Sequence, residues 1–282
     1  MSVLISDAFA LAPGGIPLNT PVFGWSSIAP ARAVIAASSA ADGFPAANLA
    51  NPSTAQRWVA GAAGSPPADA FLTITVDPEF SDPIDYLAIA VHNLGTGRNT
   101  VSVESSDLGS PVVWDELVEE AIPADDEPIV FRFAPQSLAA LRLRIQPSPL
   151  DEPTTPFVAV LYAGKLLVLP RGTHTDHIPI NRATTARVLS GRSETGNFLG
   201  RFVLAEERGT TFALQHLEPA FYDQVMAPFI DAARETPFFF AWQPQKRPRD
   251  VGYCWMTNDP QPTDQFGIAR KAISLQMGGV AV

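Results

Sequence analysis

Alternating apolar and polar residues predict short strands along the first half of the chain. The alternation is strict in residues 71–76, 100–104 and 141–145, as expected for strands with one face in water. Apolar runs bounded by turn residues predict three more strands, at 86–92, 129–133 and 157–162. Because these strands occur without a convincing helix, they predict a β-sandwich, and we place it at residues 35–170.

The pattern changes after Pro170. The polar stretch 173–194 predicts an exposed loop, and the runs 199–204 and 210–214 predict a hairpin whose turn is formed by residues 206–209. Three further strands are expected at 237–242, 251–256 and 268–276.

One helix is predicted between these strands, at residues 219–234. Phe221, Val225 and Phe229 recur at intervals of four, which places them on one helix face. Pro228 lies inside this helix and should kink or open it, because proline lacks a backbone N–H donor. Residues 171–282 are therefore expected to form strands, one helix and further strands.

The charge of the chain divides at the same place. Residues 1–170 carry 7 basic and 18 acidic side chains, a net −11, whereas residues 171–282 carry 12 basic and 11 acidic ones, a net +1. This contrast indicates two separately built domains, 35–170 and 171–282. Proline is abundant, at 27 of 282 residues, and the proline-rich residues 1–34 are expected to form an extended arm.

Composition disfavours several classes of protein. An acidic chain with no block of basic residues is a poor candidate for binding nucleic acid. No apolar stretch approaches the roughly 18–20 residues that a membrane-spanning helix needs. The N-terminus lacks the basic segment of a signal peptide, and the single Cys254 permits no internal disulfide. We therefore expect a chain that is made in a reducing cytosol and spans no membrane.

No group of residues predicts catalysis, a cofactor or a metal. His174, Asp176 and His177 lie close together, but no second ligand cluster accompanies them, so an exposed loop is favoured over a metal site. Cys254 lies between Tyr253 and Trp255, where a buried, unreactive thiol is expected. A glycan hydrolase is a weak third alternative, because any acidic chain supplies carboxylate pairs. We expect no enzyme.

Two groups of residues are candidates for binding. The first combines aromatic and polar side chains of the kind that sugar-binding sandwiches use, although core packing of the tryptophans competes with this interpretation: Arg57, Trp58, Asn93, Arg98 and Trp114. The second is the only compact basic cluster, formed by Lys246, Arg247 and Arg249. It is expected to contact an acidic surface of a neighbouring subunit.

Several of these segments resemble known families. Residues 44–58 (FPAANLANPSTAQRW) resemble the opening of discoidin-like, or galactose-binding-like, jelly-roll domains, and residues 85–94 look like the central strand of such domains in minor tail proteins of bacteriophages. The resemblance covers residues 35–168. Residues 189–193, the predicted helix and residues 238–242 are similar to tail-tip proteins of long-tailed phages and related gene-transfer particles.

These resemblances imply a mainly β fold: a galactose-binding-like jelly-roll β-sandwich, then a tail-tube-like β-sandwich with one flanking α-helix. Distal tail proteins usually place the ring-forming domain first. Here the order is reversed, unless residues 1–30 return to complete the second domain's sheet.

The implied function is a structural subunit of a phage tail tip or baseplate, a distal tail or minor tail protein. It would form an oligomeric, commonly hexameric, ring that joins the tail tube to the host-recognition parts. Its implied partners are further copies of itself, the tail tube protein, the tape measure protein and the baseplate hub or receptor-binding proteins, with host glycans as a further partner. It would be located in the virion after assembly in the host cytoplasm. The alternative is a carbohydrate-binding module that contacts host surface glycans.

Overall fold

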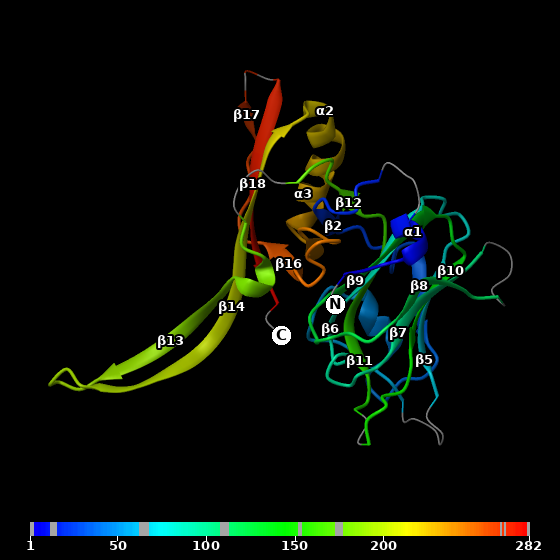
Figure 1. The fold of residues 1–282 in the computed structure, drawn as a ribbon, viewed down its shortest axis with the longest axis horizontal. Coiled ribbons are helices and arrows are strands. Elements are labelled where there is room, and N and C mark those ends of the chain that lie inside the picture. Colours follow the sequence, from blue (N-terminus) through cyan, green and yellow to red (C-terminus); the bar gives the residue numbers. More distant parts are fainter. Residues whose placement is uncertain are drawn as a thin grey trace. The chain divides into compact units, whose positions relative to one another are not determined.

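The chain folds into two compact units (Figure 1), and a computed structural model describes residues 3–11, 16–61, 68–107, 113–151, 154–172, 177–265, 267 and 269–280. The first unit comprises Met1–Gly172 and Phe238–Val251, and the second comprises Thr173–Pro237 and Gly252–Val282. The fold is mainly β, with an N-terminal β-sandwich and one C-terminal helical segment, which confirms the predicted fold class.

The first unit is built on two five-stranded sheets. One has the order β1 (Val3–Ile5), β9 (Ile129–Gln136), β6 (Ile84–His92), β11 (Phe157–Gly164), β4 (Trp58–Val59). The other has the order β3 (Ala33–Ala37), β5 (Ala70–Val76), β10 (Ala140–Ile145), β7 (Val101–Ser106), β8 (Asp115–Ala121). Side chains from both sheets form one apolar core, which includes Leu72, Leu143 and Phe131.

The strand β10 shows how the sequence pattern determines which face is buried. Leu141, Leu143 and Ile145 are buried, whereas Arg142 and Arg144 between them remain partly exposed. Successive side chains of a strand point to opposite faces, so the alternation places the three apolar residues in the core and the two arginines on the outer face.

The N-terminal residues, expected to form an extended arm, contribute strands to the first unit. β1 pairs in parallel with β9, and a short helix, α1 (Asp7–Leu11), follows it. Strand β2 (Val22–Gly24) pairs with β12 (Leu167–Val168) and with β15 (Phe238–Ala241). The buried Arg132 donates hydrogen bonds to the carbonyl oxygens of Pro17 (3.1 Å) and Leu18 (3.5 Å).

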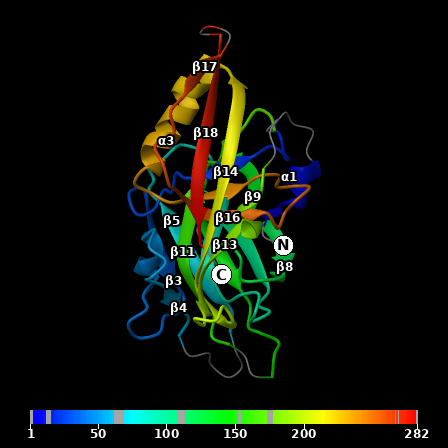
Figure 2. The same ribbon diagram turned by 90° about the vertical axis from the view of Figure 1, so that its left-hand side faces the viewer.

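In the second unit the described strands belong to one sheet. Their order is β16 (Val251–Met256), β18 (Arg270–Gly279), β14 (Phe198–Leu217), β13 (Thr184–Arg192), and β17 (Thr263–Gln265) pairs with β18. Strands β14 and β18 run side by side (Figure 2) and pair from Arg208↔Gly279 to Leu217↔Lys271, with a register shift between Leu214 and Leu217.

Two predictions for this unit are wrong. Residues 206–209 form no turn, because β14 is one continuous strand of 20 residues. The expected loop at 173–194 contains β13, which pairs with the first half of β14. Both errors have the same cause: the paired residues in this part are largely exposed on both faces, so they lack the apolar alternation that marks a strand in a sequence.

The predicted helix is present and is widened at one point. It consists of α2 (Pro219–Phe221), a π-helical turn (Tyr222–Met226) and α3 (Ala227–Ala233). A proline ring clashes with the carbonyl group four residues earlier, which for Pro228 is that of Gln224. The π-helical turn lies at that carbonyl group, where we predicted the helix to open.

Candidate functional site

An arginine stacks on two aromatic rings at an edge of the first sandwich. Arg57 directly precedes β4, whose Val59 is paired with Phe157 of β11. The guanidinium carbon of Arg57 lies 4.7 Å from the ring centroid of Phe157 and 5.6 Å from that of Phe44. The amide of Val59 donates a hydrogen bond to the carbonyl of Phe44 (3.4 Å), so β4 brings both rings to the arginine.

Asn93, a second predicted site residue, lies at the same strand start. Its Oδ1 accepts a hydrogen bond from the amide of Phe157 (2.9 Å), and its Nδ2 donates one to the carbonyl of Thr155 (2.9 Å). The structure therefore brings Arg57 and Asn93 into contact with the same residue, Phe157, Arg57 with its ring and Asn93 with its backbone amide. Asn93 uses both polar atoms to fix the backbone, so its role here is to position the loop.

The loop after Asn93 is rigidly held. The amides of Gly95 and Thr96 both donate to Oδ1 of Asp126 at 2.9 Å. The exposed Arg98 has a φ of 52°, in the left-handed region that non-glycine residues rarely occupy. Arg98 therefore belongs to the same loop as Asn93, on a backbone that its surroundings constrain.

His92 supports this loop from inside. Its Nε2 donates to the carbonyl of Glu127 (3.0 Å), and its Nδ1 accepts from the amide of Leu94 (3.3 Å). Burial lowers the pKa of His92 to about 4, against the opposing effect of the nearby Asp126 and Asp125. The imidazole is therefore neutral at physiological pH and has a structural role at the end of β6.

The assignment of Trp58 to a sugar-binding platform is wrong. Its side chain is 0% exposed and lies in the core, with Nε1 donating to the carbonyl of Ser39 at 2.8 Å. A buried ring offers no face to a sugar. The competing interpretation, core packing, is correct for this tryptophan.

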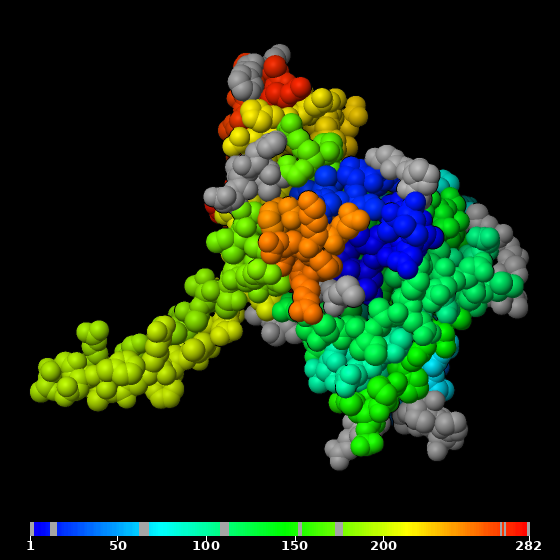
Figure 3. Space-filling view, in the orientation of Figure 1, coloured from blue at the N-terminus to red at the C-terminus, as the bar shows by residue number. Residues whose placement is uncertain are grey.

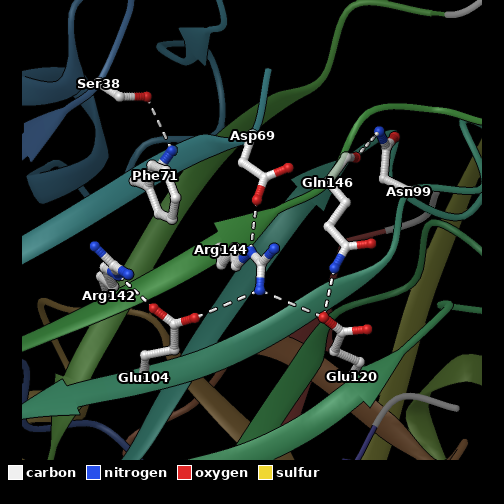
Figure 4. A network of polar contacts seen from close by, with 9 residues as sticks. All are labelled: Ser38, Asp69, Phe71, Asn99, Glu104, Glu120, Arg142, Arg144 and Gln146. Carbon is white, nitrogen blue, oxygen red and sulfur yellow. Dashed lines mark hydrogen bonds and ion pairs between the residues drawn. The ribbon is translucent and has the colours of Figure 1, made fainter. Parts of the chain in front are cut away.

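Trp114 belongs to a different cluster, on the outer face of the second sheet. The guanidinium carbon of Arg142 lies 4.0 Å from the Trp114 ring and 4.3 Å from that of Phe71. Figure 4 shows the surrounding network, in which Arg142 pairs with Glu104. Arg144 pairs with three carboxylates, those of Asp69 (2.6 Å), Glu120 (3.4 Å) and Glu104 (3.8 Å).

The charged side chains of this network pair with one another. Gln146 Nε2 also donates to Glu120 Oε1 (2.5 Å), so each charged group drawn in Figure 4 already has a partner of opposite charge or a hydrogen bond. The adjacent carboxylates raise the pKa of Arg144, chiefly through the hydrogen bond to Asp69. A ligand would have to displace these existing ion pairs, so the geometry does not favour a binding site on this face.

The second unit carries a different kind of surface. We call residues 184–207 the hairpin arm: β13, the connecting residues and the part of β14 that lies beyond its pairing with β18. Figure 3 shows it as a narrow yellow-green projection. Six large apolar side chains on it are 58–70% exposed: Leu189, Phe198, Leu199, Phe202, Val203 and Leu204.

The basic cluster lies in the first unit, in the segment after β15. Lys246, Arg247 and Arg249 are all exposed. The amide of Lys246 donates to Oδ1 of Asn19 (2.9 Å), which ties this turn to the N-terminal residues. Whether the cluster contacts a neighbouring subunit stays a prediction.

The other candidates were the single cysteine and the cluster of His174, Asp176 and His177. Cys254 is buried, and burial raises the pKa of its thiol. His174 and Asp176 lie outside the described residues, and His177 Nδ1 lies 3.2 Å from the carbonyl oxygen of Thr211. Within the described ranges, no group of three or more histidine, cysteine or acidic residues is placed to hold a metal ion. No helix in the part of the chain that the structure describes is long and apolar enough to cross a bilayer.

Comparisons with known proteins give weak matches to solved structures. No protein-family model and no curated protein matches the sequence. Chitosan-binding module 1 of a chitosanase/glucanase from Paenibacillus sp. IK-5 is 13% identical, with 50% of this chain and 99% of that chain covered and a TM-score of 0.41. A pectin-binding carbohydrate-binding module is 20% identical, with 47% and 89% covered and a TM-score of 0.36. A Clostridium perfringens module in complex with GalNAc-β-1,3-galactose is 10% identical, with 50% and 100% covered and a TM-score of 0.39. These values are too low to assign this chain to a family or to transfer a function.

Proposed function

We propose that the chain is a structural subunit that assembles with further copies of itself through the hairpin arm. The observation that carries this proposal is the set of six large apolar side chains that the arm holds in water, with Phe202 the most exposed at 70%. Exposed apolar surface of this extent is typical of interaction sites.

The energetics favour a partner for the arm. A two-stranded hairpin with both faces in water is marginally stable on its own. Full burial of a Leu, Val or Phe side chain stabilises by about 1.5–3 kcal/mol. Burying the exposed parts of six such side chains would therefore contribute on the order of 5–10 kcal/mol before the entropic cost of association.

The charges of the arm favour a second copy as that partner. Its three arginines, Arg187, Arg192 and Arg201, are matched by three glutamates, Glu194, Glu206 and Glu207. The arm is therefore neutral, although the whole chain carries −10, so arms of two copies do not repel each other. Both signs are present, which allows arginines of one copy to meet glutamates of another.

Among the described strands, the arm also has edges that pair with no neighbour. In the described sheet β13 is the last strand, and β14 pairs with β18 only from Arg208 onward. Unpaired edges of this kind are templates for strands of another chain. We take the assembly to be the tail tip or baseplate of a long-tailed phage, as the sequence resemblance implies, and assign no enzymatic activity to the chain.

Oligomeric state tests the proposal. The purified chain is expected to form closed oligomers by light scattering, and Phe202→Glu combined with Leu204→Glu is expected to reduce them to monomers. Val34→Glu is the matched control, because Val34 is equally exposed, at 70%, but lies on β3 of the first unit. A wild-type chain that stays monomeric at high concentration, or an arm variant that still assembles, would refute the proposal.

We infer carbohydrate binding as a second candidate function, for the first unit alone. The observation that favours it is the exposed Arg57 stacked on Phe44 and Phe157 beside the Asn93 loop. Aromatic and polar groups that converge in this way are common in sugar sites. On a glycan array, Phe44→Ala is expected to abolish binding. Retention of every array signal by this variant would argue against the site.

A further inference from the structure

The Arg57 side chain is held by aromatic contacts. Its guanidinium lies against the rings of Phe157 and Phe44, at 4.7 and 5.6 Å. Within the described residues, no carboxylate lies within ion-pair distance of it, and no acceptor is hydrogen-bonded to its N–H groups. Arg57 is exposed to solvent.

Arg142 on the same sandwich gives a direct comparison. It also stacks on two rings, those of Phe71 and Trp114, but its Nε–H donates to a carboxylate oxygen of Glu104. Arg142 is thus paired with a carboxylate, whereas Arg57 has no such partner among the residues that the structure describes. Stacking restricts the rotamers of the Arg57 side chain, so it loses less conformational entropy when a ligand binds.

The edge of a stacked guanidinium is suited to oxyanions. Its parallel N–H donors match the two oxygens of a carboxylate, and such bidentate pairs are among the stronger hydrogen-bonded contacts in proteins. Phe44 is 38% exposed next to it and offers an apolar surface for the C–H face of a sugar ring. Arg98, exposed on the Asn93 loop, adds a second positive charge to this part of the unit.

We propose that Arg57 binds the carboxylate of an acidic saccharide, so that the first unit selects uronate-containing glycans over neutral ones. This inference rests on the second candidate function, carbohydrate binding. The first unit carries 11 basic and 19 acidic residues, a net −8, so its overall field repels anions. An acidic ligand therefore depends on a local cation, and Arg57 supplies it.

Titration calorimetry of the full chain tests the inference. The probes are a β-1,4-linked tetramer of glucuronic acid, cellotetraose as the neutral tetramer of the same linkage, and inorganic phosphate. The wild type is expected to bind the glucuronate tetramer at least tenfold more tightly than cellotetraose. Arg57→Gln is expected to remove this preference, and Arg57→Lys, which keeps the charge but not the paired donors, to reduce it several-fold.

Arg32→Gln is the matched control, because it removes the same charge from an exposed arginine of the first unit that has no aromatic contact among the described residues. It should leave the affinity unchanged. Any of three results would overturn the inference: equal wild-type affinities for the two tetramers, an Arg57→Gln variant with unchanged affinities, or phosphate binding as strong as uronate binding. If neutral glycans still bind on the array, the proposed carbohydrate binding stands without the preference for uronates. If the wild type binds no glycan at all, both the proposed carbohydrate binding and the uronate preference are refuted.

Discussion

Two buried titratable groups of the first unit should give its stability opposite dependences on pH. Asp85 is 7% exposed, and its Oδ1 accepts a hydrogen bond from the amide of Leu166 at 2.7 Å. Burial raises the pKa of Asp85 from 3.8 to about 6, despite the opposing effects of that hydrogen bond and of Arg132 and Lys165. For His92, burial lowers the pKa from 6.5 to about 4.

The sign of each pH dependence follows from how tightly the folded and the unfolded chain bind the proton. Folded Asp85 binds its proton more tightly than the unfolded chain does, so its contribution to stability is complete below pH 3.8 and is lost as pH rises through about 6. Folded His92 binds its proton less tightly, so its contribution is complete above pH 6.5 and is lost as pH falls through about 4. At about 1.4 kcal/mol per pKa unit, each contribution is on the order of 3 kcal/mol.

The two contributions nearly cancel in the wild type, whereas each single variant should show the pH dependence of the group that remains. Asp85→Asn should leave the histidine dependence, so the free energy of unfolding falls by about 3 kcal/mol between pH 7 and pH 4 relative to the wild type. His92→Gln should leave the aspartate dependence, so the same quantity rises by a similar amount over that range. The replacements retain hydrogen-bonding groups for Leu166 and for Glu127.

The assay is urea unfolding at pH 4 to 7.5, followed in the first unit by hydrogen-exchange pulse labelling of peptides from β6 and β11. Other carboxylates contribute equally to the wild type, both single variants and the double variant, so differences between these four proteins isolate the pair. The double variant should again resemble the wild type in its pH profile. Single variants whose profiles shift in the same direction, or not at all, would refute the reasoning.

Two further predictions concern packing in the first unit. Gly164→Ala should lower the free energy of unfolding by about 2–3 kcal/mol, because a Cβ there would lie 2.2 Å from the carbonyl oxygen of Ser26. Gly172→Ala is the control: a Cβ there would have no atom within 4 Å, so the free energy of unfolding from the same urea titration should hardly change. Trp58→Phe should lower the free energy of unfolding by about 2–3 kcal/mol, because it removes the hydrogen bond to Ser39 and leaves a cavity. A decrease below about 0.5 kcal/mol would contradict the buried position of the indole.

The sequence allowed the strands of the sandwich to be predicted where one face is buried and the other is wet. This holds for β5 and β10, whose apolar residues alternate with polar ones. It fails for β8, which carries four acidic residues at the edge of its sheet, and for β13, which is exposed along nearly its whole length. Pairing with a neighbouring strand stabilises these two, and such pairing leaves no periodic signal in the sequence.

The candidate site was predictable only in part, and the error at Trp58 has a simple physical reason. Arg57 and Trp58 are consecutive, and consecutive side chains of an extended backbone point to opposite faces. Only one of them can face solvent, and the larger apolar surface of the tryptophan is the one that is buried. Phe44 and Phe157 are far apart in the sequence, so their convergence on Arg57 depends on the pairing of β4 with β11.

The division of charge also changes once the units are known, and this affects the argument for assembly. Segment Phe238–Val251, with Lys246, Arg247 and Arg249, belongs to the first unit. The first unit is then −8, and the second, with 8 basic and 10 acidic residues, is −2 rather than near +1. A weakly negative second unit gives little electrostatic reason for copies to associate. The case for self-assembly therefore rests on the hairpin arm, whose own charge is zero and whose apolar side chains lie in water.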